Sequence, residues 1–134
     1  MRSIVLFLCL MLLWPVLAMA KETELSDEFS ICVDRANGVT SENLGCISEE
    51  NVKHDARLNQ AYNGLMSVLS ERRKKELREA QRAWIKYRET TTDYLRNPDG
   101  GTLDLVIATN WFLHCTVERA DFLEGELALA TGNY

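Results

Sequence analysis

Hydrophobic residues recur at helical spacing through most of the chain after residue 40. From Thr40 or Ser41 to about Leu69, apolar side chains follow the three- and four-residue steps of one buried helical face. The positions that mark this face are Leu44, Ile47, Leu58, Tyr62, Leu65 and Leu69. Gly64 lies within the pattern and weakens a helix without ending it. We therefore expect one long helix over about 40–69.

A second long helix is expected from Ser70 to just before Pro98, because no other Pro or Gly interrupts this segment. A turn near Ser70 is required, since neither amphipathic helix buries its apolar face alone. Gln81 and Arg88 flank the apolar stripe of the second helix. The stripe itself, which we expect to be buried, consists of Leu77, Ala80, Trp84, Tyr87, Thr91 and Tyr94.

The sequence Asn97-Pro98-Asp99-Gly100-Gly101 is the clearest break in the chain. A third long helix is expected from Leu103 to about Ala130, with Thr102 as its cap. A short helix is expected over 27–37, ended by Asn-Gly. The predicted fold is an all-α antiparallel bundle of three main helices with a short N-terminal helix.

The first residues have the features of a secretory signal peptide. Arg2 precedes an uncharged apolar run that closes in an Ala-x-Ala ending at Ala20. A retained membrane anchor is the alternative, because the run approaches the roughly 20 residues that cross a bilayer, but Pro15 favours cleavage. We predict that residues 1–20 are removed on export. Residues 21–134 then form a single periplasmic or secreted domain that does not insert into a membrane.

The charge of the predicted mature chain indicates what kind of partner it has. Its 14 Lys and Arg residues stand against 20 Asp and Glu residues, a formal charge of −6, because the signal segment removes only Arg2. This excess of acid argues against nucleic-acid binding, which depends on clustered Lys and Arg. It favours a basic protein partner, which an acidic surface attracts. The oligomeric state stays open.

No catalytic, cofactor or metal site is expected. A Ser or Cys nucleophile needs a base within reach, and the chain has only His54 and His114. Neither histidine has the ligand spacing of a metal site. We therefore predict that the protein is not an enzyme.

Three cysteines follow the predicted cleavage point: Cys32, Cys46 and Cys115. Export favours a disulfide. Cys32 with Cys46 is the first choice, because the short loop between them carries a flexible Asn-Gly, and closing it would stabilise the fold by about 3 kcal/mol. A bond from Cys115 to either of the others is the alternative.

Polar residues near the apolar stripes predict a network between the three long helices. Its members are Asp55, Asn59, Gln81, Arg88 and Arg119. A buried charge needs a partner, so we expect Asp55 to accept from Arg88 or Arg119. The network is interpreted as structural, with a ligand site made of the same residues as the alternative.

Four segments together resemble a known family. They are DARLNQAY (55–62), LREAQRAWIKYRE (77–89), GGT (100–102) and CTVERADFL (115–123). In this order they are similar to the exported bacterial proteins named for the lysozyme inhibitor LprI, over roughly residues 32–127. The chain departs from the family pattern at Glu89, where Asp is frequent, and at Thr92, where Cys is frequent. Because Thr92 replaces a cysteine, Cys115 lacks the disulfide partner that family members with four cysteines would provide.

The resemblance implies a small helical envelope protein that blocks a cell-wall-degrading hydrolase such as a lysozyme. The candidate partner loop consists of Asp99, Gly100 and Gly101, with Arg96 or Trp111 as rim contacts. The alternative for this loop is a helix connector whose glycines only satisfy geometry. The alternative functions are an accessory or structural envelope protein without inhibitory activity, and an immunity protein against a secreted toxin.

Overall fold

The computed structural model describes residues 25–133, and in that range the chain forms four helices and no strand. They are α1 (Asp27–Ala36), α2 (Thr40–Val68), α3 (Glu71–Leu95) and α4 (Thr102–Thr131). The predicted all-α bundle is therefore confirmed. None of the described helices is both long and apolar enough to span a membrane. The predicted signal peptide lies outside the described residues.

The helices begin and end where local sequence signals predict. Asn37 adopts a left-handed conformation (φ 46°) and ends α1. α2 passes through Gly64 without a break, and an extended Ser70 separates α2 from α3. At the start of α4 the prediction is wrong by one residue. Thr102 is the first helical residue, and Gly101 occupies the N-cap position.

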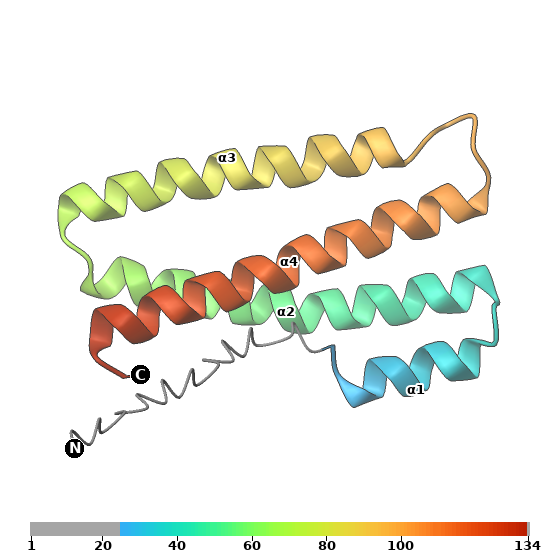
Figure 1. Ribbon diagram of the computed structural model, residues 1–134, viewed down its shortest axis with the longest axis horizontal. Helices are drawn as coiled ribbons and strands as arrows, with labels where there is room; N and C mark the ends of the chain where they lie inside the picture. The colour runs from blue at the N-terminus through green and yellow to red at the C-terminus, as the bar shows by residue number, and fades with distance from the viewer. Residues whose placement is uncertain (1–24, 134) are drawn as a thin grey trace, which may run out of the picture.

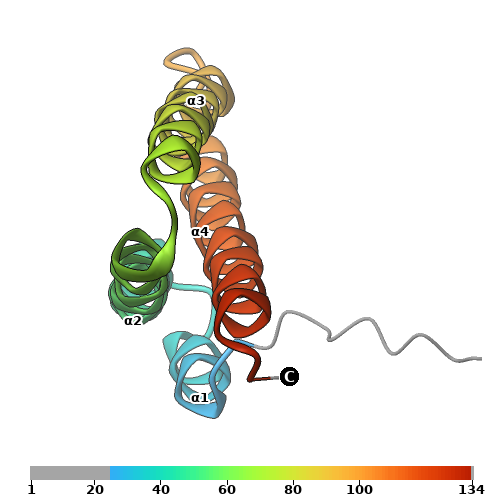
Figure 2. The same ribbon diagram turned by 90° about the vertical axis from the view of Figure 1, so that its left-hand side faces the viewer.

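α4 is the central helix of the molecule. It packs against both α2 and α3, and α1 folds back onto α2. Figure 1 shows α4 between the other two long helices, with consecutive helices running in opposite directions. Figure 2 shows α3 and α1 at the two ends of this stack. Cover on two sides accounts for apolar residues on two faces of α4, whereas Leu103 and Ile107 in its first half are exposed.

Aliphatic side chains fill the interface between α2 and α4. One buried cluster joins Leu58, Ala61 and Leu65 of α2 to Ala120 and Leu123 of α4, and a second contains Ile47, Leu113 and Val117. The two helices also approach closely at Gly64. A Cβ atom there would lie 2.7 Å from Cδ2 of Leu127. The apolar stripe predicted for residues 40–69 is thus the buried face of α2.

The stripe predicted for α3 is wrong by about one position. Ala80 is exposed, and Tyr87 and Tyr94 are 55% and 82% exposed. The buried residues of α3, a helix that the structure describes in full, are Gln81, Arg88 and Thr92. The physical reason is that α3 rests mainly on α4. One neighbour covers a narrow strip, and the Gln and Arg that were expected at its edge lie along its middle.

The predicted disulfide is present: Cys32 of α1 is bonded to Cys46 of α2. Phe29 of α1 also packs against the second aliphatic cluster. Together these contacts hold the short helix α1 against α2. Cys115 is buried on α4 and forms no disulfide with any described residue.

Candidate functional site

The α3–α4 interface is a stack of arginine and aromatic side chains. The guanidinium carbon of Arg88 lies 4.4 Å from the ring centroid of Trp84 and 3.9 Å from that of Phe112. The guanidinium carbon of Arg119 lies 5.6 Å from Trp84 and 5.0 Å from Phe122. At these distances the cations attract the ring faces, each contact contributing about 0.5–2 kcal/mol. We call these five residues the arginine–aromatic stack.

Two hydrogen bonds between α3 and α4 fix the arginines of this stack. Arg119 Nε donates to Gln81 Oε1 at 2.9 Å, and Arg88 Nη1 donates to Thr116 Oγ1 at 2.9 Å. Three members of the predicted polar network, Gln81, Arg88 and Arg119, therefore lie at one interface. The acceptors of the two arginines, Gln81 and Thr116, are neutral. The two hydrogen bonds therefore fix the register of α3 against α4 without neutralising the cations.

The predicted link from Asp55 to an arginine is not formed in the described structure. Asp55 Oδ2 accepts instead from Asn59 Nδ2 on its own helix, at 2.9 Å. Burial lowers the pKa of Arg88, and the nearby carboxylates of Asp55 and Glu89 offset this only in part. Asp55 thus acts on Arg88 through space alone. The physical reason for the missing link is that Asn59, one turn further along α2, already supplies Asp55 with a hydrogen-bond donor.

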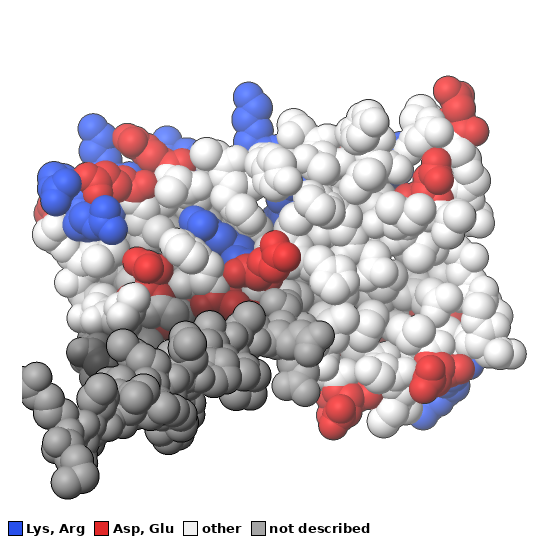
Figure 3. Space-filling view, viewed as in Figure 1, with Lys and Arg blue, Asp and Glu red and all other residues white. Residues whose placement is uncertain are grey.

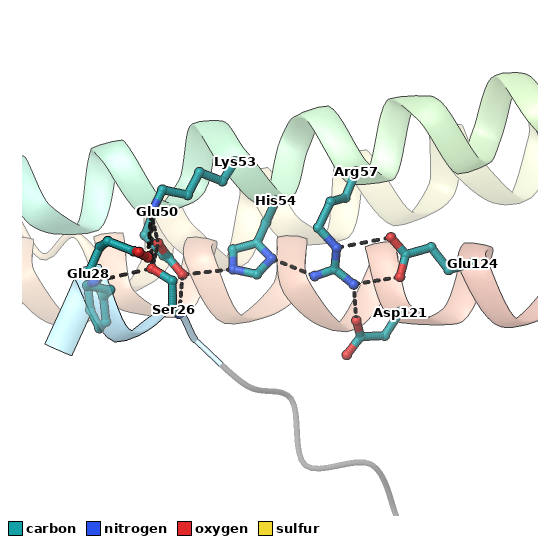
Figure 4. A network of polar contacts seen from close by, with 9 residues as sticks. Ser26, Glu28, Glu50, Lys53, His54, Arg57, Asp121 and Glu124 are labelled. Atoms are coloured by element: carbon teal, nitrogen blue, oxygen red, sulfur yellow. Dashed lines mark hydrogen bonds and ion pairs between the residues drawn. The ribbon is translucent and has the colours of Figure 1, made fainter.

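A second polar network, which the sequence analysis did not predict, connects the start of the described chain to α2 (Figure 4). The carboxylate of Glu50 is 1% exposed. It accepts from the backbone N–H and the hydroxyl of Ser26, both at 2.6 Å, and pairs with Lys53 Nζ at 3.2 Å. Burial acts to raise the pKa of Glu50, but these hydrogen bonds and one from His54 outweigh it and bring the pKa to about 2.

The same network continues along α2 to α4. Arg57 Nη1 lies 2.7 Å from His54 Nδ1, and His54 Nε2 lies 3.0 Å from Glu50 Oε1. Arginine only donates, so in this arrangement Nδ1 accepts and Nε2 carries the proton. Arg57 also forms a two-point ion pair with Glu124, at 3.0 and 2.6 Å, and contacts Asp121 at 2.6 Å. Each buried charge here has a partner of opposite sign.

A sequence signal for this second network was available. Glu50 and His54 fall on the same three- and four-residue step as Ile47, Leu58 and Leu65. A charged residue inside an apolar stripe predicts a buried and paired charge. The partner Ser26 lies far away in sequence, so no local spacing identifies it.

The candidate partner loop forms a closed turn between α3 and α4. The backbone N–H of Gly100 donates to the carbonyl of Asn97 at 3.0 Å, and Asn97 Oδ1 accepts from the backbone N–H of Asp99 at 3.1 Å. Asn-Pro-Asp-Gly is a favourable sequence for such a turn, because Pro at its second position has the required backbone angle. Asp99 is exposed at the end of the molecule.

Connector geometry bears on both loop glycines. A Cβ atom on Gly100 would overlap the carboxylate of Asp104, so a larger residue there would require the Asp104 side chain to move. Gly101 has an ordinary φ of −93°, and a Cβ atom there would meet nothing within 4 Å. Gly101 is the N-cap residue of α4, a position that favours glycine, and its carbonyl accepts from the backbone N–H of Asp104 at 3.1 Å.

Large apolar side chains are exposed on the two helices that flank this loop. Tyr94 is 82% exposed, Leu103 67% and Ile107 46%. Tyr87 is also largely exposed and packs edge-on against Trp111, with ring centroids 6.2 Å apart. We call Tyr94, Asp99, Gly101, Leu103 and Ile107 the loop surface. Its members lie in the loop and on the adjoining parts of α3 and α4, and they include three exposed apolar side chains and one exposed acidic side chain.

Comparison with known proteins identifies the family of this chain. The family model described as lysozyme inhibitor LprI matches residues 32–123. A search of curated proteins gives no match, and a search of solved structures gives none either. The matched span contains the disulfide, both hydrogen bonds of the α3–α4 interface and the partner loop. The family's description is that of an inhibitor and not of an enzyme, and the chain belongs to this lysozyme inhibitor LprI family.

Proposed function

We propose that this protein is an exported inhibitor that binds a basic cell-wall hydrolase, most simply a lysozyme, through the loop surface. The observation that supports this proposal is a closed acidic turn flanked by exposed large apolar side chains. Exposed large apolar side chains in one patch favour contact with a partner, and the proposal requires that Tyr94, Leu103 and Ile107 form such a patch.

The loop needs little ordering in order to bind. Its two internal hydrogen bonds, from the backbone N–H groups of Gly100 and Asp99 to Asn97, fix the turn before any partner arrives. Ordering a flexible segment on binding costs affinity, and a segment that is already ordered avoids that cost. Asp99 at the tip is suited to a cationic group of the hydrolase, and Gly101 allows a close approach of backbone.

The apolar flank would supply the contact area. Aromatic residues are enriched at the centres of protein interfaces, where their burial contributes much of the binding energy. Tyr94 and Leu103 come from α3 and α4 on either side of the loop. Figure 3 shows few charged side chains on the face over the end of α3 and the start of α4, with Asp and Glu at its edges.

Charge would steer the encounter. Glu89, Asp93 and Asp99 are exposed along the end of α3 and the loop, against Lys86 and Arg96. The excess of acid agrees in sign with the formal charge of −6 of the predicted mature chain. An acidic surface speeds association with a basic protein at low salt. We therefore expect inhibition to weaken as salt rises, since the Debye length falls to about 8 Å at physiological ionic strength.

Lysis of bacterial cell walls by a basic lysozyme tests the proposal. The mature protein, from Lys21 onward, should slow lysis in proportion to its concentration. A Tyr94→Ala, Asp99→Lys double variant should lose at least tenfold in inhibitory potency, because it removes an aromatic contact and reverses a charge. Glu79→Lys makes the same charge change at an exposed position of α3 outside the loop surface, and it should remain close to the unaltered protein.

Two outcomes would contradict the proposal in different ways. Absence of protection at a large molar excess of the mature protein would reject inhibition of the lysozyme tested. Full inhibition by the double variant would keep inhibition but reject the loop surface as the contact. Circular dichroism of each variant verifies that the helices are intact.

A further inference from the structure

A groove lies away from the loop surface, at the opposite end of the bundle. It has a volume of about 470 Å³ and lies between the end of α2, the start of α3 and the end of α4. Sites for small molecules typically measure about 300–1,000 Å³. The side chains that matter for its chemistry are Leu65, Leu69, Leu77, Arg119, Phe122 and Leu129.

The walls of the groove are mostly apolar and reach the surface. Phe122 and Leu129, both on α4, are 52% and 64% exposed. Leu69, the C-cap residue of α2, and Leu77 of α3 lie at the edge of the aliphatic cluster and are partly buried. The groove therefore offers a continuous apolar lining from the core of the bundle to solvent, as an alkyl chain requires.

One wall carries the cation of Arg119, which forms no ion pair with any described residue. Arg119 Nε donates to Gln81, but Arg119 Nη2 is shielded from solvent and has no acceptor, and no described residue accepts from Nη1. Burial lowers the pKa of Arg119, and no carboxylate offsets this effect. A guanidinium usually binds a carboxylate or phosphate through two parallel hydrogen bonds. An oxyanion would use Nη1 and the unpaired Nη2, and Nη2 becomes accessible only when the side chains that shield it move.

The other charged groups of the groove leave Arg119 available. Glu76 is paired with Arg72 and Arg73, at 2.8 and 2.6 Å. Glu126 also lines the groove, seven residues after Arg119 on α4, which places it about 10 Å further along the helix. That separation is comparable with the Debye length at physiological salt. Glu126 therefore repels an anion bound at Arg119 only weakly.

We propose that this groove binds a single-chain amphiphile with a carboxylate head, such as a medium-chain fatty acid. The carboxylate contacts the guanidinium of Arg119, and the alkyl chain lies along Leu69, Leu77 and Leu129. The groove extends past residue 123, where the family match ends. The proposal does not depend on inhibition of a hydrolase.

Titration calorimetry of the mature protein with decanoate and with decanol tests the proposal. The two probes share an alkyl chain and differ in the charge of the head. Decanoate should bind at least tenfold more tightly than decanol. Arg119→Gln should remove this preference and leave the decanol affinity unchanged. Arg96→Gln, which removes an exposed arginine outside the groove, should bind decanoate as the unaltered protein does.

A second variant covers the case in which Arg119→Gln does not fold. Leu129→Trp changes an exposed side chain and fills the groove with a larger one, so it should weaken decanoate and decanol alike by tenfold or more. Equal affinities of the unaltered protein for the two probes, or no binding of either, would overturn the proposal. Undiminished binding of decanoate by Leu129→Trp would place the ligand elsewhere and overturn it as well.

Discussion

α4 has two long neighbours and meets them with different chemistry. Toward α2 it buries aliphatic side chains such as Leu113 and Leu123, both fully covered. Toward α3 the interface contains Arg88, Arg119 and the rings on which they stack. The α2–α4 interface resembles an ordinary protein core. The α3–α4 interface contains one buried and one partly buried arginine, Arg88 and Arg119, with neutral hydrogen-bond acceptors.

Because of this difference in chemistry, one interface mainly stabilises the fold and the other mainly orients α3. Apolar burial stabilises by about 25 cal/mol per Å², so the aliphatic interface carries most of the folding free energy. Removing a guanidinium from water costs several kcal/mol, which stacking and hydrogen bonds offset without a large surplus. The arginine–aromatic stack instead fixes how α3 lies on α4, because Gln81 and Thr116 accept in one register only. That register also sets where the loop surface is presented.

The largest effect is expected from the aliphatic interface. Leu123→Ala should lower the free energy of unfolding by about 3–4 kcal/mol, because it leaves a cavity at a fully buried position. Urea denaturation followed by circular dichroism measures this change. Leu129→Ala, at a position 64% exposed, is the matched control and should stay within about 0.5 kcal/mol. If Leu123→Ala lowers the free energy of unfolding by less than about 1 kcal/mol, the α2–α4 interface is not the main source of stability.

A smaller and more local effect is expected from the stack. Trp84→Ala removes the ring shared by Arg88 and Arg119 and should cost about 2–3 kcal/mol, less than a fully buried Trp. Hydrogen exchange should show faster exchange in α3 and little change in α2, because α3 opens as a separate unit. Tyr94→Ala, at an exposed position of the same helix, serves as the control. Equal loss of protection in α2 and α3 would show that the two interfaces are not separable.

Low pH should remove the stabilisation that Glu50 provides between Ser26 and α2, and it should leave the arginine–aromatic stack unchanged. The pKa of Glu50 is lowered from 4.5 to about 2 in the folded protein, so its contribution to stability is complete above about pH 4.5 and is lost as pH falls toward 2. The loss amounts to about 2–3 kcal/mol. Arginines stay charged throughout this range. Chemical denaturation at pH 6 and pH 2.5 measures the difference.

Glu50→Gln isolates this carboxylate from the others. The variant should be less stable at pH 6 and should lose less stability than the unaltered protein between pH 6 and pH 2.5. Glu49→Gln, at the exposed neighbouring position, should retain the full acid dependence. An identical pH dependence for Glu50→Gln and the unaltered protein would contradict the assignment.

The smallest effect is expected when a buried cation is replaced by an apolar side chain of similar length. Arg88→Met retains contact with Trp84 and Phe112 and removes the desolvated charge, so the free energy of unfolding should change by less than about 1 kcal/mol or rise. Denaturation measures it, with Arg88→Ala, which also loses the packing, as the comparison. A loss above about 2 kcal/mol for Arg88→Met would show that the cation itself stabilises the interface.

Local chemistry was enough to predict much of this molecule. Asn37 with its following glycine, Ser70 and Pro98 end or separate helices through their own backbone preferences, so the helix boundaries were close to those observed. The Cys32–Cys46 bond was predictable because a short loop brings its ends together. Gln81 and Arg119 were expected in one network, and they do meet.

Tertiary packing decided which side chains are buried on α3 and which partners the charges have. Periodicity alone favoured Tyr87 and Tyr94, but contact with a single neighbour covered Gln81 and Arg88 and left the tyrosines in solvent.

The sequence by itself therefore determined the helices and most of their ends, and it indicated the family and the preferred disulfide. Only the tertiary structure decided between Cys46 and Cys115 as the partner of Cys32. It also decided that Asp55 bonds within its own helix and that Ser26 donates to the buried Glu50. Arg119 forms no ion pair with any described residue. The physical reason is the distance along the chain over which each effect acts. Backbone preferences act within a few residues, whereas burial and charge pairing depend on segments far apart in the chain.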